Sequence, residues 1–238
     1  MRLRRAPAEG AATAFATAPR PDDGTAWREA GWCAVDLEMT GLNPRTDEIV
    51  AIGAVPISEG RVVLGEGIYT LVRAYKRSQV GAVLVHKLRL ADVADAPSLD
   101  EGMDRVLAAL AGRVPVFHTA AIERAFLERQ FSRRHVRLPA AADTEALGRA
   151  WLRHRDGSEG APAQGISLGR LAGALGQPTE SPHHALGDAL TTATAFIALA
   201  SLLDTVAPQT VGSLLRTSTE AVGGGGGPSG GSRRLGPG

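Results

Sequence analysis

The sequence contains very little cysteine and very little lysine. Its single cysteine, Cys33, excludes an internal disulfide and favours a reducing compartment, so we expect a cytoplasmic protein. Lys76 and Lys87 are the only lysines, and arginine supplies nearly all of the positive charge. Together with the excess of alanine and glycine, this indicates a GC-rich coding bias and says little about function.

A strong net charge is also absent. Lysine and arginine together number 26 and aspartate and glutamate 25, which leaves a formal net charge of +1. Such a balance does not identify a nucleic-acid-binding protein, so a phosphate-binding role must come from a local arrangement. No apolar run approaches the roughly 20 residues needed to cross a bilayer, and we expect no contact with a membrane.

The two ends of the chain differ in composition from its middle. Residues 1–29 are rich in Ala, Pro, Arg and Asp without a period, and we interpret them as a disordered N-terminal arm. The run at residues 11–18 faintly resembles a signal peptide, but it is short and weakly apolar. Residues 206–238 end in Gly, Pro and Ser, which predicts a flexible tail. A single domain over residues 30–205 is left between them.

The apolar pattern of that middle region predicts an α/β domain. Three apolar runs joined by short turns indicate an antiparallel meander, at residues 32–39, 49–57 and 61–71. Two short apolar runs indicate further strands, at residues 113–117 and 140–143. Helical spacing predicts helices at residues 83–93, 99–110, 121–134, 144–153, 167–176 and 185–203. A meander followed by alternating helices and strands is typical of a mixed sheet flanked by helices.

Two acids lie at the end of the first predicted strand. Asp36 and Glu38 are two residues apart, so both carboxylates point to the same face of the strand. Two like charges this close are costly unless a cation lies between them, and Mg²⁺ prefers such carboxylate oxygens. The alternative is a half-exposed edge strand with two solvated acids.

Further acids and histidines lie at the ends of other predicted elements. A buried strand ends at His118, and Glu123 follows in the first turns of a helix, where its simpler role is to complement the helix dipole. His183 precedes the longest predicted helix, and Asp188 lies about one turn inside it among apolar residues. A carboxylate in such surroundings requires a partner or a metal. Asp143 most simply ends a strand and caps the next helix, and we assign it no chemistry.

Four carboxylates from strand and helix ends can hold two divalent metals about 3.5–4 Å apart. The candidates are Asp36, Glu38, Glu123 and Asp188. In such a site one metal activates a water, and the other stabilises the leaving oxygen of a phosphodiester. A neutral histidine beside the water, here His183, can accept its proton near pH 7.

In order and spacing, these motifs resemble the DnaQ-like (DEDDh) 3′→5′ exonuclease superfamily. Three stretches carry the resemblance: Asp36-x-Glu38-x-Thr40-Gly41, residues 48–55 and residues 183–189. The first is most similar to oligoribonucleases, and the third to the DNA-polymerase proofreading type. The resemblance covers about residues 32–203 and implies a ribonuclease H-like fold with a five-stranded mixed sheet. It also implies two Mg²⁺ or Mn²⁺ ions and hydrolysis of nucleotides from a 3′ end.

The second motif departs from the family pattern. The family usually has His-Asn-x-x-Phe-Asp, and this sequence has His118-Thr119-Ala120-Ala121-Ile122-Glu123. Glu123 therefore stands at the position of a metal-binding aspartate; glutamate is one methylene longer and can still ligate. The resemblance also implies residues that contact the terminal nucleotide: Thr40, Gly41, Leu42, His86 and His118.

The leading hypothesis is an active two-metal exonuclease that acts on single-stranded DNA or RNA 3′ ends, with DNA favoured. A DNA polymerase is a candidate partner. The altered second motif leaves open an alternative, a catalytically weak or inactive nucleic-acid-binding or polymerase-associated module of the same fold. A protein-interaction module tethered by the glycine-rich tail is the third hypothesis.

Overall fold

The computed structural model describes residues 10–76, 78–80, 82–83, 87–157, 165–180 and 182–223. Within them, one sheet contains the strands β1 (Trp32–Met39), β2 (Ile49–Ser58), β3 (Arg61–Val62), β4 (Ile68–Leu71), β5 (Val114–Phe117) and β6 (Ala142–Asp143). The α-helices are α1 (Ala11–Thr17), α3 (Leu99–Leu110), α4 (Ala121–Arg133), α5 (Thr144–Asp156), α6 (Leu168–Ala174), α7 (Ala185–Val206) and α8 (Val211–Gly223). Two short 3-10 helices are η1 (Leu64–Glu66) and η2 (Leu90–Val93).

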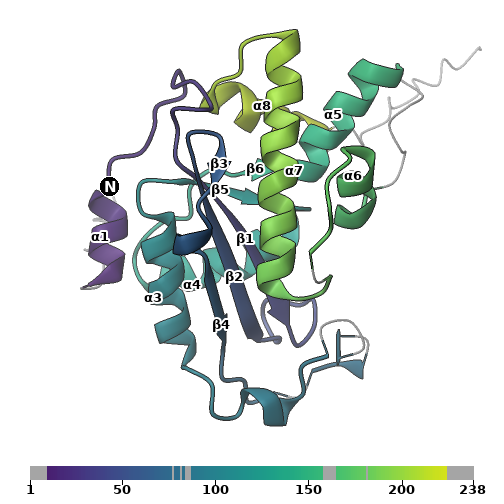
Figure 1. The fold of residues 1–238 in the computed structure, drawn as a ribbon. Helices are drawn as coiled ribbons and strands as arrows, with labels where there is room; N and C mark the ends of the chain where they lie inside the picture. The colour runs from purple at the N-terminus through teal and green to yellow at the C-terminus, as the bar shows by residue number, and fades with distance from the viewer. Residues whose placement is uncertain are drawn as a thin grey trace, which may run out of the picture.

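The sheet is mixed, as the sequence predicted. Its strand order is β3-β2-β1-β5-β6, and β4 also pairs with β2. β1 is antiparallel to β2, whereas β1, β5 and β6 are parallel to one another (Figure 1). The third predicted strand, at residues 61–71, is interrupted by η1, so β3 and β4 share one edge of β2. The predicted fold class is confirmed, with that strand divided in two.

The two faces of β1 contribute to two separate cores. Trp32 and Ala34 pack in a cluster with α7, whereas Val35 and Leu37 pack in a cluster with α3 and α4. Figure 1 shows α7 crossing one face of the sheet, with α3 on the opposite side. Because side chains alternate between the faces of a strand, Asp36 belongs to the face that α7 covers.

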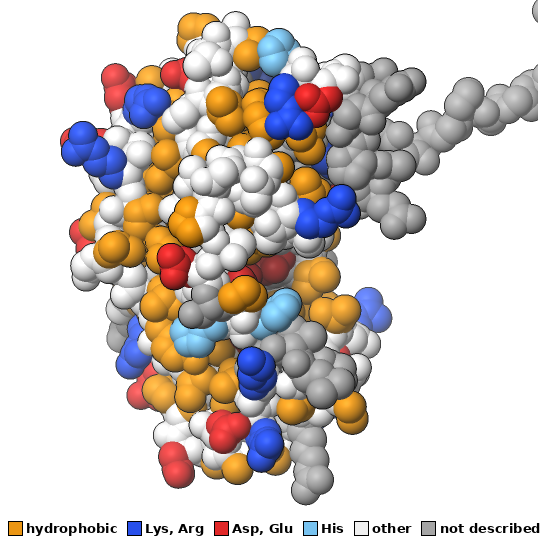
Figure 2. All heavy atoms as spheres, turned by 45° about the vertical axis from the view of Figure 1, so that its right-hand side comes forward, with side chains coloured by type: hydrophobic (Ala, Val, Ile, Leu, Met, Phe, Trp, Pro, Cys, Tyr) orange, Lys and Arg blue, Asp and Glu red, His pale blue; other side chains and the backbone are white. Residues whose placement is uncertain are grey.

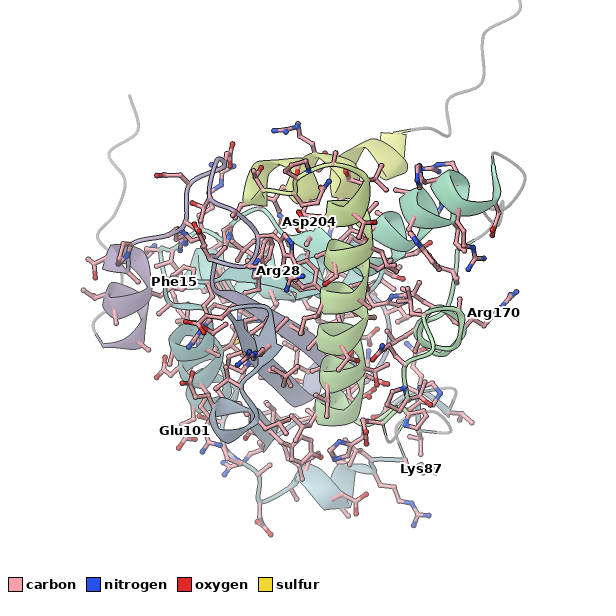
Figure 3. The ribbon with its side chains drawn as sticks, turned by 45° about the horizontal axis from the view of Figure 1, so that its top comes forward. Phe15, Arg28, Lys87, Glu101, Arg170 and Asp204 are labelled. Carbon is pink, nitrogen blue, oxygen red and sulfur yellow. The ribbon has the colours of Figure 1, made fainter. Side chains whose placement is uncertain are left out.

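The N-terminal segment is folded, contrary to expectation. Phe15 of α1 is 1% exposed, and its ring meets that of Phe131 edge-on with centroids 5.3 Å apart. Figure 3 shows Phe15 on the side of α1 that faces the rest of the domain. Trp27 is also buried. The predicted disordered arm is therefore wrong for residues 10–29, because two buried aromatic rings hold the segment in place. Residues 1–9 lie outside the described residues.

The predicted flexible tail is folded over its first half. Val211 and Leu214 of α8 are buried in the same core cluster as α7. The hydroxyl of Ser218 is buried and accepts the backbone N–H of Asp143 (2.9 Å). The prediction is therefore wrong for residues 206–223, because α8 has an apolar face that packs into the core. The glycine-rich composition applies only to the residues that follow. The residues after α8 lie outside the described part of the chain.

The helices between these ends lie close to where the sequence placed them. The exception is the predicted helix at residues 83–93, which is described only in part and ends in η2. Among the described helices, α7 alone has the length and composition to cross a bilayer, with 22 residues and a mean hydropathy of 1.6 in its most apolar window. The expectation that no segment reaches that length was wrong for α7, which packs along β1 and β2.

Candidate active site

Three carboxylates gather at the carboxyl end of β1. Asp36 and Glu38 belong to β1 and Asp188 to the first turn of α7. One oxygen of each lies within 4.8 Å of the others. None of the ion pairs among the described residues includes any of these three acids. The acid cluster therefore has negative charge that no protein cation neutralises.

A glycine brings α7 onto the sheet at this point. Asp36 is paired with Gly53 of β2 in the antiparallel register. A Cβ atom at position 53 would lie 2.1 Å from the carbonyl oxygen of Ala185, the first residue of α7, so a larger residue does not fit. The start of α7 consequently rests on the backbone of β2, and Asp188 reaches the acids of β1 one turn later.

Burial raises the pKa of every acid in the cluster, and repulsion by neighbouring carboxylates adds to this for Asp36 and Glu38. Burial raises the pKa of Asp36 well above its ordinary value, and the three neighbouring carboxylates add to the effect. Burial, followed by the charge of Asp188, raises the pKa of Glu38 to about 7. Burial also raises the pKa of Asp188, although the backbone N–H of His183 opposes that shift. A divalent cation would relieve all of these costs.

Glu123 approaches the acid cluster from the first turn of α4. Its Oε2 atom is buried and has no hydrogen-bond partner. Burial raises the pKa of Glu123 to about 8, and the charges of Asp143 and Glu38 act in the same direction. The charge of Glu123 in turn raises the pKa of Asp36. A buried carboxylate oxygen without a partner is rare in folded proteins, and it suits a ligand atom better than a helix-dipole contact.

His183 lies on the turn before α7. The residue is exposed, and its backbone is left-handed with a φ of 62°. Its N–H donates to Oδ2 of Asp188 (2.8 Å). The next residue, His184, stacks on Tyr69 of β4 with ring centroids 4.4 Å apart, a contact that the sequence did not indicate. Figure 2 shows histidine side chains beside a hollow in which acidic side chains are recessed.

His118 has a different environment from the predicted one. Its Nδ1 lies 2.9 Å from Oγ1 of Thr144, and its Nε2 lies 2.9 Å from the carbonyl oxygen of Ile166. Burial lowers the pKa of His118. Both ring nitrogens are thus engaged in joining the end of β5 to α5 and to the segment before α6, and neither is left for a substrate. His86, the other histidine expected near the substrate, lies outside the described residues.

Asp143 caps α5 as predicted, and it does more. Its carboxylate accepts the N–H of Glu145 (2.9 Å) in that cap. It also accepts the N–H groups of Thr119 (3.1 Å) and Ala120 (2.9 Å), immediately before α4. Asp143 therefore positions the start of the helix that carries Glu123. Sequence reasoning missed this role because Thr119 is 24 residues away along the chain.

The loop expected to meet the substrate follows β1 directly. Thr40 is buried, and its hydroxyl accepts the N–H of Glu48 across the loop (3.0 Å). A Cβ atom at Gly41 would lie 2.4 Å from a carboxylate oxygen of Asp47, so the loop is tightly closed there. Leu42 is 68% exposed. The loop therefore holds an apolar side chain in solvent close to the acid cluster.

Sequence comparisons place the chain among known proteins. The RNase T exonuclease family model matches residues 33–196, from β1 into α7. The chain belongs to this exonuclease family. It is 36% identical over 183 residues to a DNA polymerase III subunit epsilon-like protein from Rhodobacter capsulatus, over 76% of this chain and 25% of the relative. It is 26% identical over 182 residues to a PolC-type DNA polymerase III from Thermotoga petrophila, over 75% and 12% respectively. The chain thus spans a quarter or less of the length of these relatives.

Solved exonuclease structures share the fold of this family member. Exonuclease X in complex with 5′ overhanging duplex DNA matches with a TM-score of 0.57 and 21% identity, over 79% of this chain and 99% of that one. Exonuclease I of E. coli in complex with a dA16 oligonucleotide matches with a TM-score of 0.59 and 19% identity, over 74% and 41%. At these identities the likeness concerns the fold, and it confirms the ribonuclease H-like architecture.

Proposed function

We propose that the chain is a metal-dependent 3′→5′ exonuclease that releases nucleoside monophosphates from single-stranded nucleic-acid ends. The observation that carries this proposal is the close group of Asp36, Glu38 and Asp188, which takes part in none of the ion pairs of the described residues. Membership in the exonuclease family supports the reaction class. The carboxyl end of the central strand is also where open α/β sheets commonly bind ligands.

The residues present fit two divalent ions. Mg²⁺ and Mn²⁺ both prefer carboxylate oxygens. Asp36, Glu38 and Asp188 would hold them together with Glu123, whose buried Oε2 has no other partner. When bound, two such ions activate a water and neutralise the charge that develops on the leaving oxygen. The raised pKa values of Asp36, Glu38 and Glu123 reflect unfavourable burial and repulsion of their charges, which bound cations would offset.

His183 is the proposed general base. Its hydrogen bond to Asp188 and the stack of His184 on Tyr69 fix the turn that carries it. The exposed imidazole can accept the proton of the attacking water at neutral pH. The loop at Thr40–Leu42 would lie against the terminal nucleotide, with Leu42 supporting the last base.

DNA is the favoured substrate, and a DNA polymerase is a candidate partner. The named relatives are a subunit epsilon-like protein of DNA polymerase III and a PolC-type DNA polymerase III. The solved exonucleases are described in complex with duplex DNA and with an oligodeoxynucleotide. These descriptions support a replication-associated role for this chain.

The glutamate in the second motif supports a second candidate, a nucleic-acid-binding module of the same fold with weak or no hydrolysis. Glu123→Asp discriminates between the two candidates. A rise of tenfold or more from a weak activity supports the binding module, because the wild-type side chain then misplaces the metal. Weak activity that Glu123→Asp leaves unchanged, with substrate still bound, also supports the binding module, whereas strong activity of the parent chain supports the active enzyme.

The direct test uses single-stranded DNA and RNA oligonucleotides labelled at the 3′ or the 5′ end. The purified chain is incubated with them in Mg²⁺, in Mn²⁺ and in EDTA, and Asp36→Asn is the matched control. We expect a ladder that shortens from the 3′ end with metal and no shortening in EDTA or with the variant. Intact oligonucleotides under every condition would contradict the proposal.

A further inference from the structure

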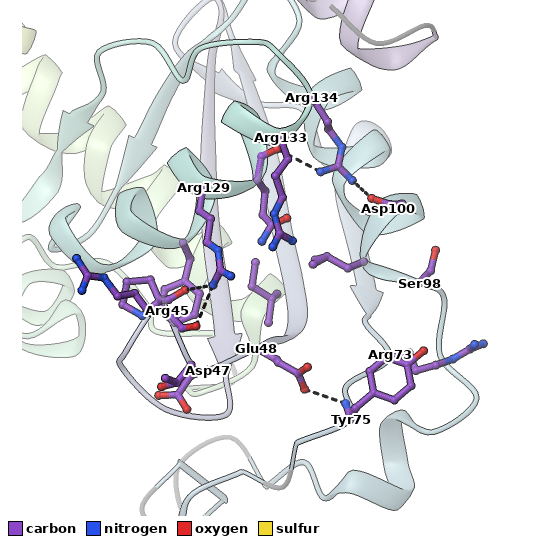
Figure 4. Close-up of a pocket in the computed structure, with 16 residues that line it drawn as sticks. Arg45, Asp47, Glu48, Arg73, Tyr75, Ser98, Asp100, Arg129, Arg133 and Arg134 are labelled. Carbon is purple, nitrogen blue, oxygen red and sulfur yellow. Dashed lines mark hydrogen bonds and ion pairs between the residues drawn. The ribbon is translucent and has the colours of Figure 1, made fainter.

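A second polar cavity lies across the β1–β2 loop from the acid cluster. It has a volume of about 500 Å³ and is bounded by this loop, the segment after β4, the start of α3 and the second half of α4 (Figure 4). Five of the residues that line it are arginines: Arg45, Arg73, Arg129, Arg133 and Arg134. We call this cavity the arginine pocket. It contains a large share of positive charge for a protein whose net charge is only +1.

The acids that line the arginine pocket are already engaged. Asp100 forms an ion pair with Arg134. The carboxylate of Glu48 accepts two backbone N–H groups of the segment after β4 (2.8 and 2.7 Å). Asp47 forms an ion pair with Lys76, which holds the pKa of that carboxyl below its ordinary value. Arg134 and Lys76 thus take up the charges of Asp100 and Asp47, and the four remaining arginines outnumber Glu48, the one other acid in the lining.

Those four arginines have no carboxylate partner among the ion pairs of the described residues. Arg129 donates to two carbonyl oxygens of the β1–β2 loop (2.6 and 3.2 Å), and Nε of Arg73 donates to one carbonyl oxygen (3.2 Å). Figure 4 shows Arg129 and Arg133 extending together from α4, with Arg45 and Arg73 on opposite sides of them. Guanidinium groups without a carboxylate partner, spread in this way, match a series of phosphates better than one small anion.

The arginine pocket also has an exposed aromatic ring and an apolar floor. Tyr75 lies at its rim and is 79% exposed, whereas Ile49 and Phe126 are buried beneath it. Proteins that bind single-stranded nucleic acid combine cations along the backbone with aromatic rings on which bases stack. An acidic peptide would use the charges but has no comparable use for the ring. The chemistry therefore favours a nucleic-acid strand as the occupant.

The arginine pocket and the acid cluster share one loop. Ile49, which lines the pocket, pairs with Met39, the residue that follows Glu38. Glu48, also in the lining, bonds to Thr40 at the start of the same loop. The two sites thus lie on opposite sides of one strand pair, at the same end. A strand whose 3′ terminus lies at the acids meets the arginines on crossing this loop.

We propose that the arginine pocket binds phosphates of the substrate strand upstream of its 3′ terminus. The inference rests on the proposed exonuclease function and extends it, because it assigns a site that favours long strands over very short ones. Arg45 and Arg133 take phosphates, and Tyr75, on the far side of Arg133 from Arg45 (Figure 4), offers a stacking face to a further base. Arg129 holds the loop in place through its two carbonyl contacts.

The test compares the double variant Arg45→Gln/Arg133→Gln with Arg105→Gln/Arg153→Gln. Both pairs remove the same charge, and the control arginines are exposed and lie outside the pocket lining. Binding of a 5′-fluorescein-labelled dT12 and dT3 is measured by anisotropy in EDTA, over a series of salt concentrations. We expect Kd for dT12 to rise about tenfold in the pocket variant and less than twofold in the control. The salt slope should fall by about 1.4, since each single-strand phosphate contact contributes about 0.7.

Equal weakening of dT12 binding in the two double variants would overturn the proposal, since net charge alone would then explain it. A loss of the same size for dT3 would also overturn it, because dT3 is too short to span both sites. The binding measurement needs no cleavage, so it is independent of the exonuclease assay. Pocket-dependent binding without metal-dependent cleavage would show that the proposed function fails while the pocket still binds nucleic acid.

Discussion

Two sets of buried acids lie close together at the carboxyl end of the sheet, and they differ in how their oxygens are used. Asp143 accepts three backbone N–H groups, and Asp47 pairs with Lys76 and accepts the N–H of Asn43 (2.9 Å). None of the ion pairs among the described residues includes Asp36, Glu38 or Asp188, and Asp188 accepts the backbone N–H of His183 through one oxygen. A carboxylate whose oxygens are all bonded to the protein maintains the fold, whereas one that keeps an oxygen without a protein partner is available to a ligand.

The same contrast applies to the histidines. Both ring nitrogens of His118 are held by protein oxygens, whereas His183 is exposed on a turn that Asp188 fixes through the backbone. We therefore expect substitutions in the partnered set to reduce stability first. Substitutions in the unpartnered set should reduce turnover and leave the fold intact.

The largest effect is expected for Asp36→Asn. Loss of this ligand should lower kcat by about three to four orders of magnitude, because metal binding contributes several kcal/mol to the transition state and each 1.36 kcal/mol is tenfold. The thermal midpoint in EDTA should stay the same or rise, since a buried repulsive charge is removed. Single-turnover kinetics and a thermal melt of the same preparation measure both. Full activity in this variant would show that the acid cluster is not the catalytic site.

His183→Ala comes next, with an expected loss of about 10²–10³-fold in kcat, within the usual range for a general base. His118→Ala is its matched control from the partnered set. It should lower the melting temperature instead, because Thr144 and Ile166 lose their contacts with the ring. A stability loss in His183→Ala equal to that in His118→Ala would remove the distinction between the two histidines.

Asp143→Ala should cost about 3 kcal/mol of unfolding free energy, because three N–H groups lose a charged acceptor. The loss of kcat should be smaller than that of Asp36→Asn, because Asp143 acts only by positioning α4 and Glu123. It should diminish on cooling, because the start of α4 is then more ordered. Urea unfolding at two temperatures, paired with kinetics, provides the measurement. An unchanged unfolding free energy would mean that Asp143 is not the anchor of α4.

The smallest expected effect is on the pH dependence of stability without metal. Burial raises the pKa of Glu38 to about 7 and that of Glu123 to about 8, from an ordinary value of 4.5. The folded chain therefore keeps protons that the unfolded chain releases, and stability should fall as pH rises from about 4.5 to 8. Thermal melts in EDTA over this range should show the decline, and Glu123→Gln should flatten it. A decline that is as steep in Glu123→Gln as in the parent chain would contradict this assignment of the raised pKa.

Much of the fold could be predicted because the apolar residues of most helices and strands recur with the spacing typical of that element. β2 is apolar along its length, and α3 begins with the Ser98 cap and Glu101 that the sequence displays. The two-residue spacing of Asp36 and Glu38 was enough to predict that their side chains lie on the same face of β1. The place of Asp188 followed from the resemblance, and the structure adds the reason, which is the contact of Gly53 with Ala185.

The parts that sequence reasoning missed depend on contacts between distant residues. Phe15 is buried against Phe131 of α4 and in the core cluster that includes α3, and no local pattern at residue 15 reveals these contacts. The hydrogen bonds from the N–H groups of Thr119 and Ala120 to Asp143 likewise cannot be predicted from the sequence, because the residues are far apart along the chain. The family resemblance placed His118 near the substrate, but its two partners come from α5 and from the segment before α6.

The most direct test of the central claim is the number of Mn²⁺ ions that the chain binds, measured by electron paramagnetic resonance titration with Asp36→Asn and Asp143→Asn in parallel. The account predicts two ions per parent chain, a loss of at least one ion in Asp36→Asn, and no loss in Asp143→Asn at a temperature where it is folded. No specific Mn²⁺ binding by the parent chain, or equal binding by the parent and Asp36→Asn, would contradict the claim that the unpartnered acids form a metal site.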